Sequence, residues 1–269
     1  KMNTLIRKPA FPLALGLFVG YFGRRLLTSA AASSSGPITL HIYDHCPFCI
    51  RVELFLSRNN ISYSRVVYGY GAGAPPSKKG YDPTGGPVKL LGKKLLPVLE
   101  INGSLYGESL DIIGRLQTLP SIPSIPCASS PTRLNEWKKI FSPLKSALVR
   151  PRIVKLKHLK DWEDERDVGY AREKYSNMGF DYEDVLSRSS SLKSEISSSL
   201  KSLDTDVLLG SSPISINSYG WGVDDLCLLP DLRSLTCVEG VVWPERVRKY
   251  LEEGFENCQA ELYWEYQVE

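Results

Sequence analysis

The decisive stretch of this chain is Ile38-Thr39-Leu40-His41-Ile42-Tyr43-Asp44-His45-Cys46-Pro47-Phe48-Cys49. Its apolar beginning, residues 38–43, predicts a strand, and a helical pattern over residues 47–58 starts directly at the Cys-Pro-Phe-Cys motif. Proline is well tolerated at a first helical position, where its missing N–H would be unpaired anyway. Cys46 is therefore expected where a strand passes into a helix.

A thiol in that position suits redox chemistry. The start of a helix offers unpaired N–H groups and roughly half a positive charge, which lower the pKa of such cysteines to about 3.5–7.5. In a CxxC motif the exposed thiolate, here Cys46, attacks a disulfide sulfur. Cys49, expected to be the more buried thiol one turn inside the helix, then attacks the mixed disulfide and releases the product. Cys46 and Cys49 are the predicted catalytic residues.

Composition excludes several classes of function. The 269 residues have an ordinary globular composition and suffice for two domains. The net charge of +3, from 33 basic and 30 acidic residues, is too balanced to indicate a nucleic-acid or anionic membrane partner. The other cysteines, Cys127, Cys227, Cys237 and Cys258, lack the paired spacing of a disulfide framework, and a structural zinc site would need a second CxxC pair. We expect no metal.

Residues 1–36 predict a targeting segment, disordered or removed. The first 43 residues carry five Lys or Arg side chains and no acidic one, and residues 28–35 are rich in Ser and Ala. The apolar run over residues 10–22 is shorter than the roughly 20 residues that span a bilayer, so a stable membrane association is not favoured. That run also resembles the apolar part of a signal peptide, as in a bipartite plastid leader. We expect cleavage between about Thr28 and Gly36 and a mitochondrial or plastid location, or a cytosolic one if the leader is not functional.

Residues 37–118 predict an α/β thioredoxin-like domain. Asn102-Gly103 between two β-type runs is a strong hairpin signal. Helix 109–116 is expected to turn Leu110, Ile113 and Leu116 inward. The expected order is β-α-β-α-β-β-α, with strands at 38–43, 62–68, 96–101 and 104–106, helices at 47–58, 89–94 and 109–116, and a Gly/Pro-rich excursion at 69–87.

The second half of the chain predicts an all-α domain. Four prolines after Leu119 make residues 119–131 an interdomain linker. Residues 132–269 then show helical periodicity without a strand signal. The expected helical runs lie at 134–148, 170–175, 192–203, 226–235 and 244–263.

Three further features are candidates for function. Pro97 begins a strand after Leu96, and the sequence alone does not decide between a cis and a trans bond. Ser109 after Glu108 is equally compatible with plain helix capping and with carboxylate binding at a helix start. A basic cluster favours a solvated helix face over an anion-binding wall; it comprises Arg150, Arg152, Lys155, Lys157, His158 and Lys160.

Three blocks of the first half resemble the active-site segments of the glutaredoxin 2 family: residues 43–49, 96–99 and 107–113. Residues 224–236 and 242–247 are similar to the helical domain of that family, as is 172–175. The resemblance covers residues 38–263 and implies a glutathione-transferase-like fold. Two local departures stand out: the excursion over 69–87 looks longer, and Gly222 replaces the Ser or Thr that usually caps the helix containing Asp225.

The resemblance also implies roles for individual residues. Cys46 would form the mixed disulfide with glutathione, and Cys49 would resolve it. Leu96 would pair its backbone with glutathione ahead of a cis Pro97, while Glu108 and Ser109 would hold the γ-glutamyl end. The implied glutathione-binding residues are Pro47, Phe48, Leu96, Pro97, Glu108 and Ser109.

The expected function is therefore a glutathione-dependent thiol–disulfide oxidoreductase. Glutathione would be its co-substrate, and disulfide-containing or glutathionylated proteins would be its partners. A monomer is expected. The alternatives are a cysteine-type glutathione transferase or dehydroascorbate reductase, a protein resembling membrane-associated prostaglandin E synthase, and a non-catalytic adaptor that binds glutathione.

Overall fold

A four-stranded mixed sheet forms the first half of the protein in the computed structural model, which describes residues 37–75, 81–119, 122, 124–126 and 130–269. Its strands are β1 (Ile38–Ile42), β2 (Ser64–Val67), β3 (Val98–Ile101) and β4 (Ser104–Gly107), in the order β2-β1-β3-β4. Strand β1 is parallel to β2 and antiparallel to β3. The Asn-Gly hairpin prediction is confirmed, because Asn102 (φ 52°) and Gly103 (φ 75°) form the turn between β3 and β4.

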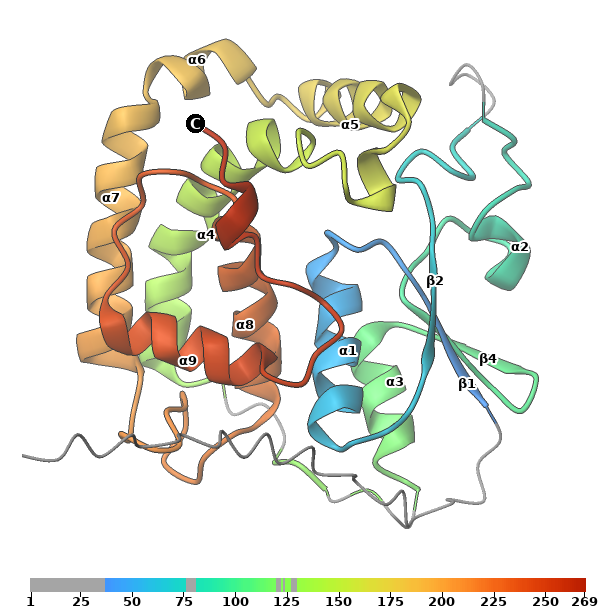
Figure 1. Cartoon of the computed structure of the whole chain (residues 1–269), viewed down its shortest axis with the longest axis horizontal. Coiled ribbons are helices and arrows are strands. Elements are labelled where there is room, and N and C mark those ends of the chain that lie inside the picture. The colour runs from blue at the N-terminus through green and yellow to red at the C-terminus, as the bar shows by residue number, and fades with distance from the viewer. Residues whose placement is uncertain (1–36, 76–80, 120–121, 123, 127–129) are drawn as a thin grey trace, which may run out of the picture. The chain divides into compact units, whose positions relative to one another are not determined.

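Helices cover both faces of this sheet. Figure 1 shows α1 (Pro47–Arg58) and α3 (Ser109–Leu116) on one side and the short α2 (Val88–Leu91) on the other. The predicted β-α-β-α-β-β-α order is confirmed. The expectation for Leu110 is wrong: its side chain is 47% exposed, because the buried stripe of α3 runs through Ile112, Ile113 and Leu116 instead.

The second half is helical, as predicted. The run expected over 244–263 is too long, since α9 ends at Phe255, where the N–H of Cys258 turns back to the Phe255 carbonyl. The sequence did not predict α6. The helices are α4 (Thr132–Ile153), α5 (Glu165–Asn177), α6 (Tyr182–Ser187), α7 (Ser189–Ser202), α8 (Val223–Leu235) and α9 (Glu245–Phe255), with 3₁₀ helices η1 (Lys160–Trp162) and η3 (Trp264–Tyr266) and a π turn, η2 (Leu203–Val207).

The two halves pack directly against each other. Helix α1 lies between the sheet and α8 (Figure 1), packs against α8 and α3, and is joined to β2 by the ion pair of Glu53 with Arg65. Its inner residues Cys49, Val52 and Leu56 are fully buried, as the helical pattern predicted. The fold is therefore α/β thioredoxin-like followed by all-α, the glutathione-transferase-like arrangement.

The Gly/Pro-rich excursion after β2 is attached to the helical half by Asp167 of α5. This buried carboxylate accepts hydrogen bonds from the Gly71 N–H (2.6 Å) and the Tyr81 hydroxyl (2.9 Å). A Cβ atom at Gly69 would lie 2.4 Å from Asp167 Oδ2, so only glycine fits there without a shift. The start of the excursion is thereby fixed near the first turn of α1.

Several expectations fall beyond the described part of the chain. The leader over residues 1–36 and Cys127 lie outside it, and the linker over 119–131 is described only at 119, 122, 124–126 and 130–131. Within the described ranges, none of the helices has the length and apolarity needed to cross a bilayer.

Candidate active site

Cys46 lies at the junction between β1 and α1, as the sequence predicted. It occupies the N-cap position of α1 (φ −76°, ψ 119°), with Pro47 as the first helical residue. No side-chain oxygen caps this helix. The backbone N–H groups of Phe48 and Cys49 are therefore directed at the sulfur of Cys46.

The two thiols have opposite electrostatic environments. The S–H of Cys49 donates to the Cys46 sulfur, and this bond is the largest contribution that lowers the pKa of Cys46 to about 7, against the opposing effect of burial. The charge of His45 and the two backbone N–H groups lower this pKa further. Burial and the neighbouring Cys46 raise the pKa of Cys49. The pKa of Cys46 falls in the range expected for a helix start, but the largest single cause is the second thiol.

This arrangement predicts the pH dependence of Cys46 alkylation. The rate with iodoacetamide should rise through a midpoint near pH 7, because lowering the pKa populates the thiolate at lower pH than for a free cysteine, whose pKa is about 8.5. Cys49→Ala removes the S–H donor and should move the midpoint upward. Stopped-flow alkylation followed by mass spectrometry of the Cys46 peptide measures both. A wild-type midpoint near 8.5 would contradict the geometry.

Asp161 of η1 holds the turn before Cys46. Its carboxylate is fully buried and accepts the N–H of Asp44 (2.9 Å) and the N–H of His45 (2.6 Å). The Nδ1 of His45 lies 2.6 Å from the same carboxylate, which requires the proton on Nδ1. The ring of His45 also packs on Trp162. The helical half of the protein therefore fixes the residue that precedes the nucleophile.

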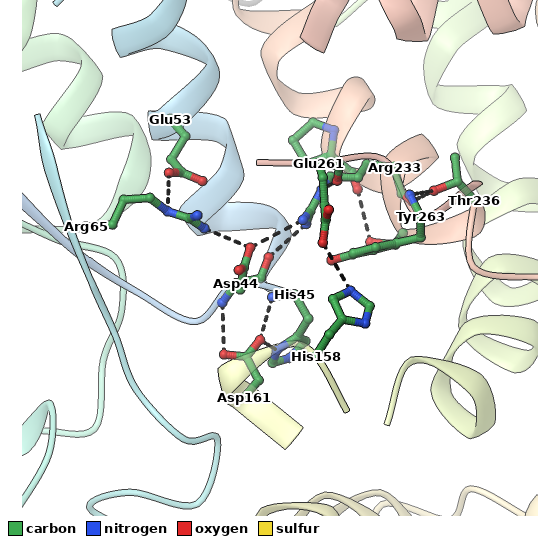
Figure 2. Close-up of polar contacts among 12 residues, drawn as sticks. Asp44, His45, Glu53, Arg65, His158, Asp161, Arg233, Thr236, Glu261 and Tyr263 are labelled. Atoms are coloured by element: carbon green, nitrogen blue, oxygen red, sulfur yellow. Dashed lines mark hydrogen bonds and ion pairs between the residues drawn. The ribbon is translucent and has the colours of Figure 1, made fainter. Parts of the chain in front are cut away.

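A second set of charges holds Asp44 from the opposite side (Figure 2). Arg233 of α8, which is 1% exposed, donates to the Asp44 carbonyl (2.8 Å) and lies 3.3 Å from Asp44 Oδ1. Arg65 of β2 lies 2.8 Å from both Asp44 Oδ1 and Glu53 Oε1. Burial raises the pKa of Glu53 to about 7 despite Arg65. Asp44 and His45 are thus held by Asp161, Arg233 and Arg65, which we call the turn clamp.

A cleft of about 570 Å³ opens beside Cys46. Its sheet side contains Cys46, Pro47, Phe48 and Leu96, and α4, α5 and α8 supply its other wall. The Phe48 side chain is exposed at the rim, whereas Cys49 is buried beneath Cys46. The cleft thus gives a small molecule or an extended peptide access to one sulfur of the pair.

The glutaredoxin 2 C-terminal domain model matches residues 133–266, and a glutathione S-transferase N-terminal domain model matches residues 45–119. Glutaredoxin 2 of Escherichia coli strain K12 is 28% identical over 224 residues, which are 83% of this chain and 96% of that protein. The chain belongs to the glutaredoxin 2 family. A crystal structure of glutaredoxin 2 from Salmonella typhimurium in complex with glutathione has the same fold, with a TM-score of 0.74 and 24% identity over 87% of this chain and 100% of that one.

Of the pair Leu96-Pro97, which resembles the glutaredoxin 2 family, Leu96 lines the cleft. The Leu96–Pro97 bond is cis, as the resemblance implied. Leu96 precedes β3, and neither its N–H nor its C=O bonds to any other residue in the described part of the chain. Because Leu96 is buried, these two backbone groups are unpaired polar groups beside Cys46.

Glu108 and Ser109 lie at the start of α3, outside the residues that line the cleft. Glu108 is the N-cap residue, with φ +64° and no side-chain cap bond. Of the two alternatives for Ser109, plain capping is wrong, because Ser109 is already the first helical residue and its hydroxyl accepts a bond from Arg51 Nη1 (3.0 Å). The side chain of Glu108 is exposed.

The solvated-face interpretation of the basic cluster is wrong for two of its members. Arg152 is 1% exposed and donates to the Leu148 carbonyl and to the Ser189 hydroxyl. Arg150 lines the cleft. Helix α4 ends at Ile153, so these two arginines lie on the packed end of the helix, while Lys155, Lys157 and Lys160 are exposed beyond it.

Sequence reasoning missed Asp161, Arg233 and Lys94. The ammonium of Lys94 donates to the Tyr43 hydroxyl and to the carbonyls of Tyr70 and Ala72, and burial lowers its pKa to about 8. Asp161 lies in a run of charged residues, between Lys160 and the acids at 163–165, so the local sequence does not indicate that it is buried. Contacts between residues so far apart in sequence leave no periodic pattern.

Proposed function

We propose that this protein is a glutathione-dependent thiol–disulfide oxidoreductase that removes glutathione from mixed disulfides. The observation that carries the proposal is the pairing of a lowered pKa at Cys46 with a raised pKa at Cys49, beside a cleft that reaches only Cys46. A thiolate attacks a disulfide readily, and a thiol kept protonated beneath it is ready to resolve the product.

The reaction balances as two thiol–disulfide exchanges. The Cys46 thiolate attacks the glutathionyl sulfur, and the partner protein leaves as a thiolate that takes up a proton. A second glutathione thiolate then attacks the Cys46 mixed disulfide, which releases oxidised glutathione and restores Cys46. Alternatively, Cys49 attacks this mixed disulfide, glutathione leaves, and two further glutathione molecules reduce the Cys46–Cys49 disulfide. The two electrons come from glutathione on either route.

The cleft has features that fit glutathione, which the Salmonella relative holds in its crystal structure. The unpaired N–H and C=O of Leu96 would bond to the peptide backbone of the glutathione cysteine, ahead of Pro97. Pro47 and Phe48 would flank its sulfur. Beyond the residues that line the cleft, Glu108 and the N–H of Ser109 at the start of α3 would hold the charged γ-glutamyl end.

A comparison of three electrophiles tests this function. We expect the highest kcat/KM with a glutathionylated peptide, and at least about tenfold lower values with an aryl halide and with dehydroascorbate, because Cys49 serves only a disulfide reaction. A coupled assay with glutathione reductase measures the first and the third, and absorbance measures the second. A preference for the aryl halide would assign the protein to the transferases, and a preference for dehydroascorbate to the reductases of that substrate. No turnover, with glutathione still bound, would indicate an adaptor.

A further inference from the structure

The cleft beside Cys46 is rich in cations. Lys94, Lys145, Arg150 and Lys174 all line the cleft, and Asp231 is the one carboxylate among its described lining residues. A cation that is paired with a carboxylate, or whose N–H donors all bond to protein oxygens, offers less to a substrate than a cation without such partners. The partners of each therefore decide which of them a ligand can reach.

Two of the four cations are already satisfied. Lys145 forms an ion pair with Asp231 at 2.6 Å, and neither side chain is more than 23% exposed. Lys94 uses all three of its donors on the oxygens of Tyr43, Tyr70 and Ala72. The charge of Lys145 is therefore compensated by Asp231, whereas Lys94 keeps its charge but has no N–H donor left for a substrate.

Arg150 and Lys174 differ from this pair. The guanidinium of Arg150 lies over the rings of Tyr175 (4.6 Å) and Phe180 (5.0 Å), and in the described chain no oxygen accepts from it. Aromatic faces hold the plane of a guanidinium and leave the N–H groups at its edge available. Lys174 donates to the Tyr70 hydroxyl (2.7 Å), and no carboxylate of the described residues lies within ion-pair distance of it.

We propose that Arg150 and Lys174 form a carboxylate-binding wall, and that the protein selects glutathionylated substrates that carry acidic residues beside the modified cysteine. This inference rests on the proposed function. Arg150 comes from α4 and Lys174 from α5, whereas Leu96 and α3, where glutathione is proposed to bind, belong to the sheet half. A partner chain whose cysteine is joined to a glutathione bound on the sheet side would therefore extend toward the helical side of the cleft and pass along this wall.

Alkylation of Cys46 tests the charge of the wall without any turnover of a disulfide substrate. Iodoacetate carries a carboxylate and iodoacetamide does not, and both react with the same Cys46 thiolate, so the ratio of their rates cancels a change in its pKa. We expect this ratio to fall by about threefold in the Arg150→Gln/Lys174→Gln variant. It should stay constant in Lys139→Gln, whose ammonium is also on α4 but pairs with Glu136 on the exposed surface. An unchanged ratio in the double variant would overturn the wall.

The substrate class is tested with two glutathionylated peptides that differ only by Glu or Gln on either side of the cysteine. Wild-type protein and Lys139→Gln should favour the Glu peptide about tenfold in kcat/KM at low salt, and the double variant should show little preference. Similar values for both peptides in the wild type would reject the inference while leaving the proposed function intact. If the double variant loses kcat/KM equally with both peptides and its KM for glutathione rises, the wall binds the carboxylates of glutathione and not those of the partner. That result would also reject the inference. Failure to turn over either peptide would instead remove the proposed function.

Discussion

Replacing Cys46 with serine is expected to lower glutathione-dependent disulfide reduction by about three orders of magnitude or more. The hydroxyl of serine is not ionised near neutral pH, so the N–H groups of Phe48 and Cys49 would face a group that cannot attack sulfur. The measurement is the initial rate of peptide deglutathionylation, coupled to oxidation of NADPH by glutathione reductase. Circular dichroism and urea unfolding verify that the variant folds.

Two matched variants separate the roles of the thiols. Cys49→Ser should retain deglutathionylation, since a second glutathione can resolve the Cys46 mixed disulfide, but it should lose the route through an intramolecular disulfide. Cys227→Ser, in α8 and outside the cleft lining, should leave both routes unchanged. Substantial activity in Cys46→Ser would refute the assignment of the nucleophile.

Asp161→Asn is expected to lower the free energy of unfolding by about 3 kcal/mol and to raise the midpoint of Cys46 alkylation. The buried carboxylate accepts from two backbone N–H groups and from His45, and an amide cannot accept all three bonds. Part of the charge that lowers the pKa of Cys46 comes from His45, which would lose its ionic partner.

Urea unfolding and the pH series of alkylation measure the two effects separately. Glu163→Gln makes the same chemical change two residues away on an exposed side chain, and should alter the free energy of unfolding by less than about 0.5 kcal/mol. Asp161→Glu keeps the charge and should restore part of the alkylation shift. If Asp161→Asn destabilises the protein but leaves the alkylation midpoint unchanged, Asp161 is structural and does not position the site.

Local sequence signals predicted the parts of the fold that depend on local physics. The strand before Cys46, the proline that starts α1 and the Asn-Gly turn each follow from the backbone preferences of a few adjacent residues. The same reasoning failed at Leu110 and at the end of α9. At Leu110, the packing of α3 against its neighbours decides which residues are buried. At the end of α9, a backbone turn decides where the helix stops.

The charged residues that hold the candidate site could not be predicted from local sequence signals. Asp161 acts on residues 116 and 117 positions earlier, and Arg233 acts on Asp44 across 189 positions. Arg150 and Arg152 look like members of a solvated basic run, because a run of charges does not reveal which of its members the fold turns inward. Only the packing of α4 against its neighbours separates them from Lys155 and Lys157.

The turn clamp changes how natural variants of this protein should be interpreted. Two of its three anchors are encoded far downstream of the Cys-Pro-Phe-Cys motif, in the half that contains no reactive thiol of the pair. A fragment ending at residue 118 would keep the motif and the whole sheet, yet lose Asp161 and Arg233. Substitutions of Asp161 and Arg233 should therefore be grouped with active-site substitutions. A screen restricted to the Cys-Pro-Phe-Cys motif would overlook them.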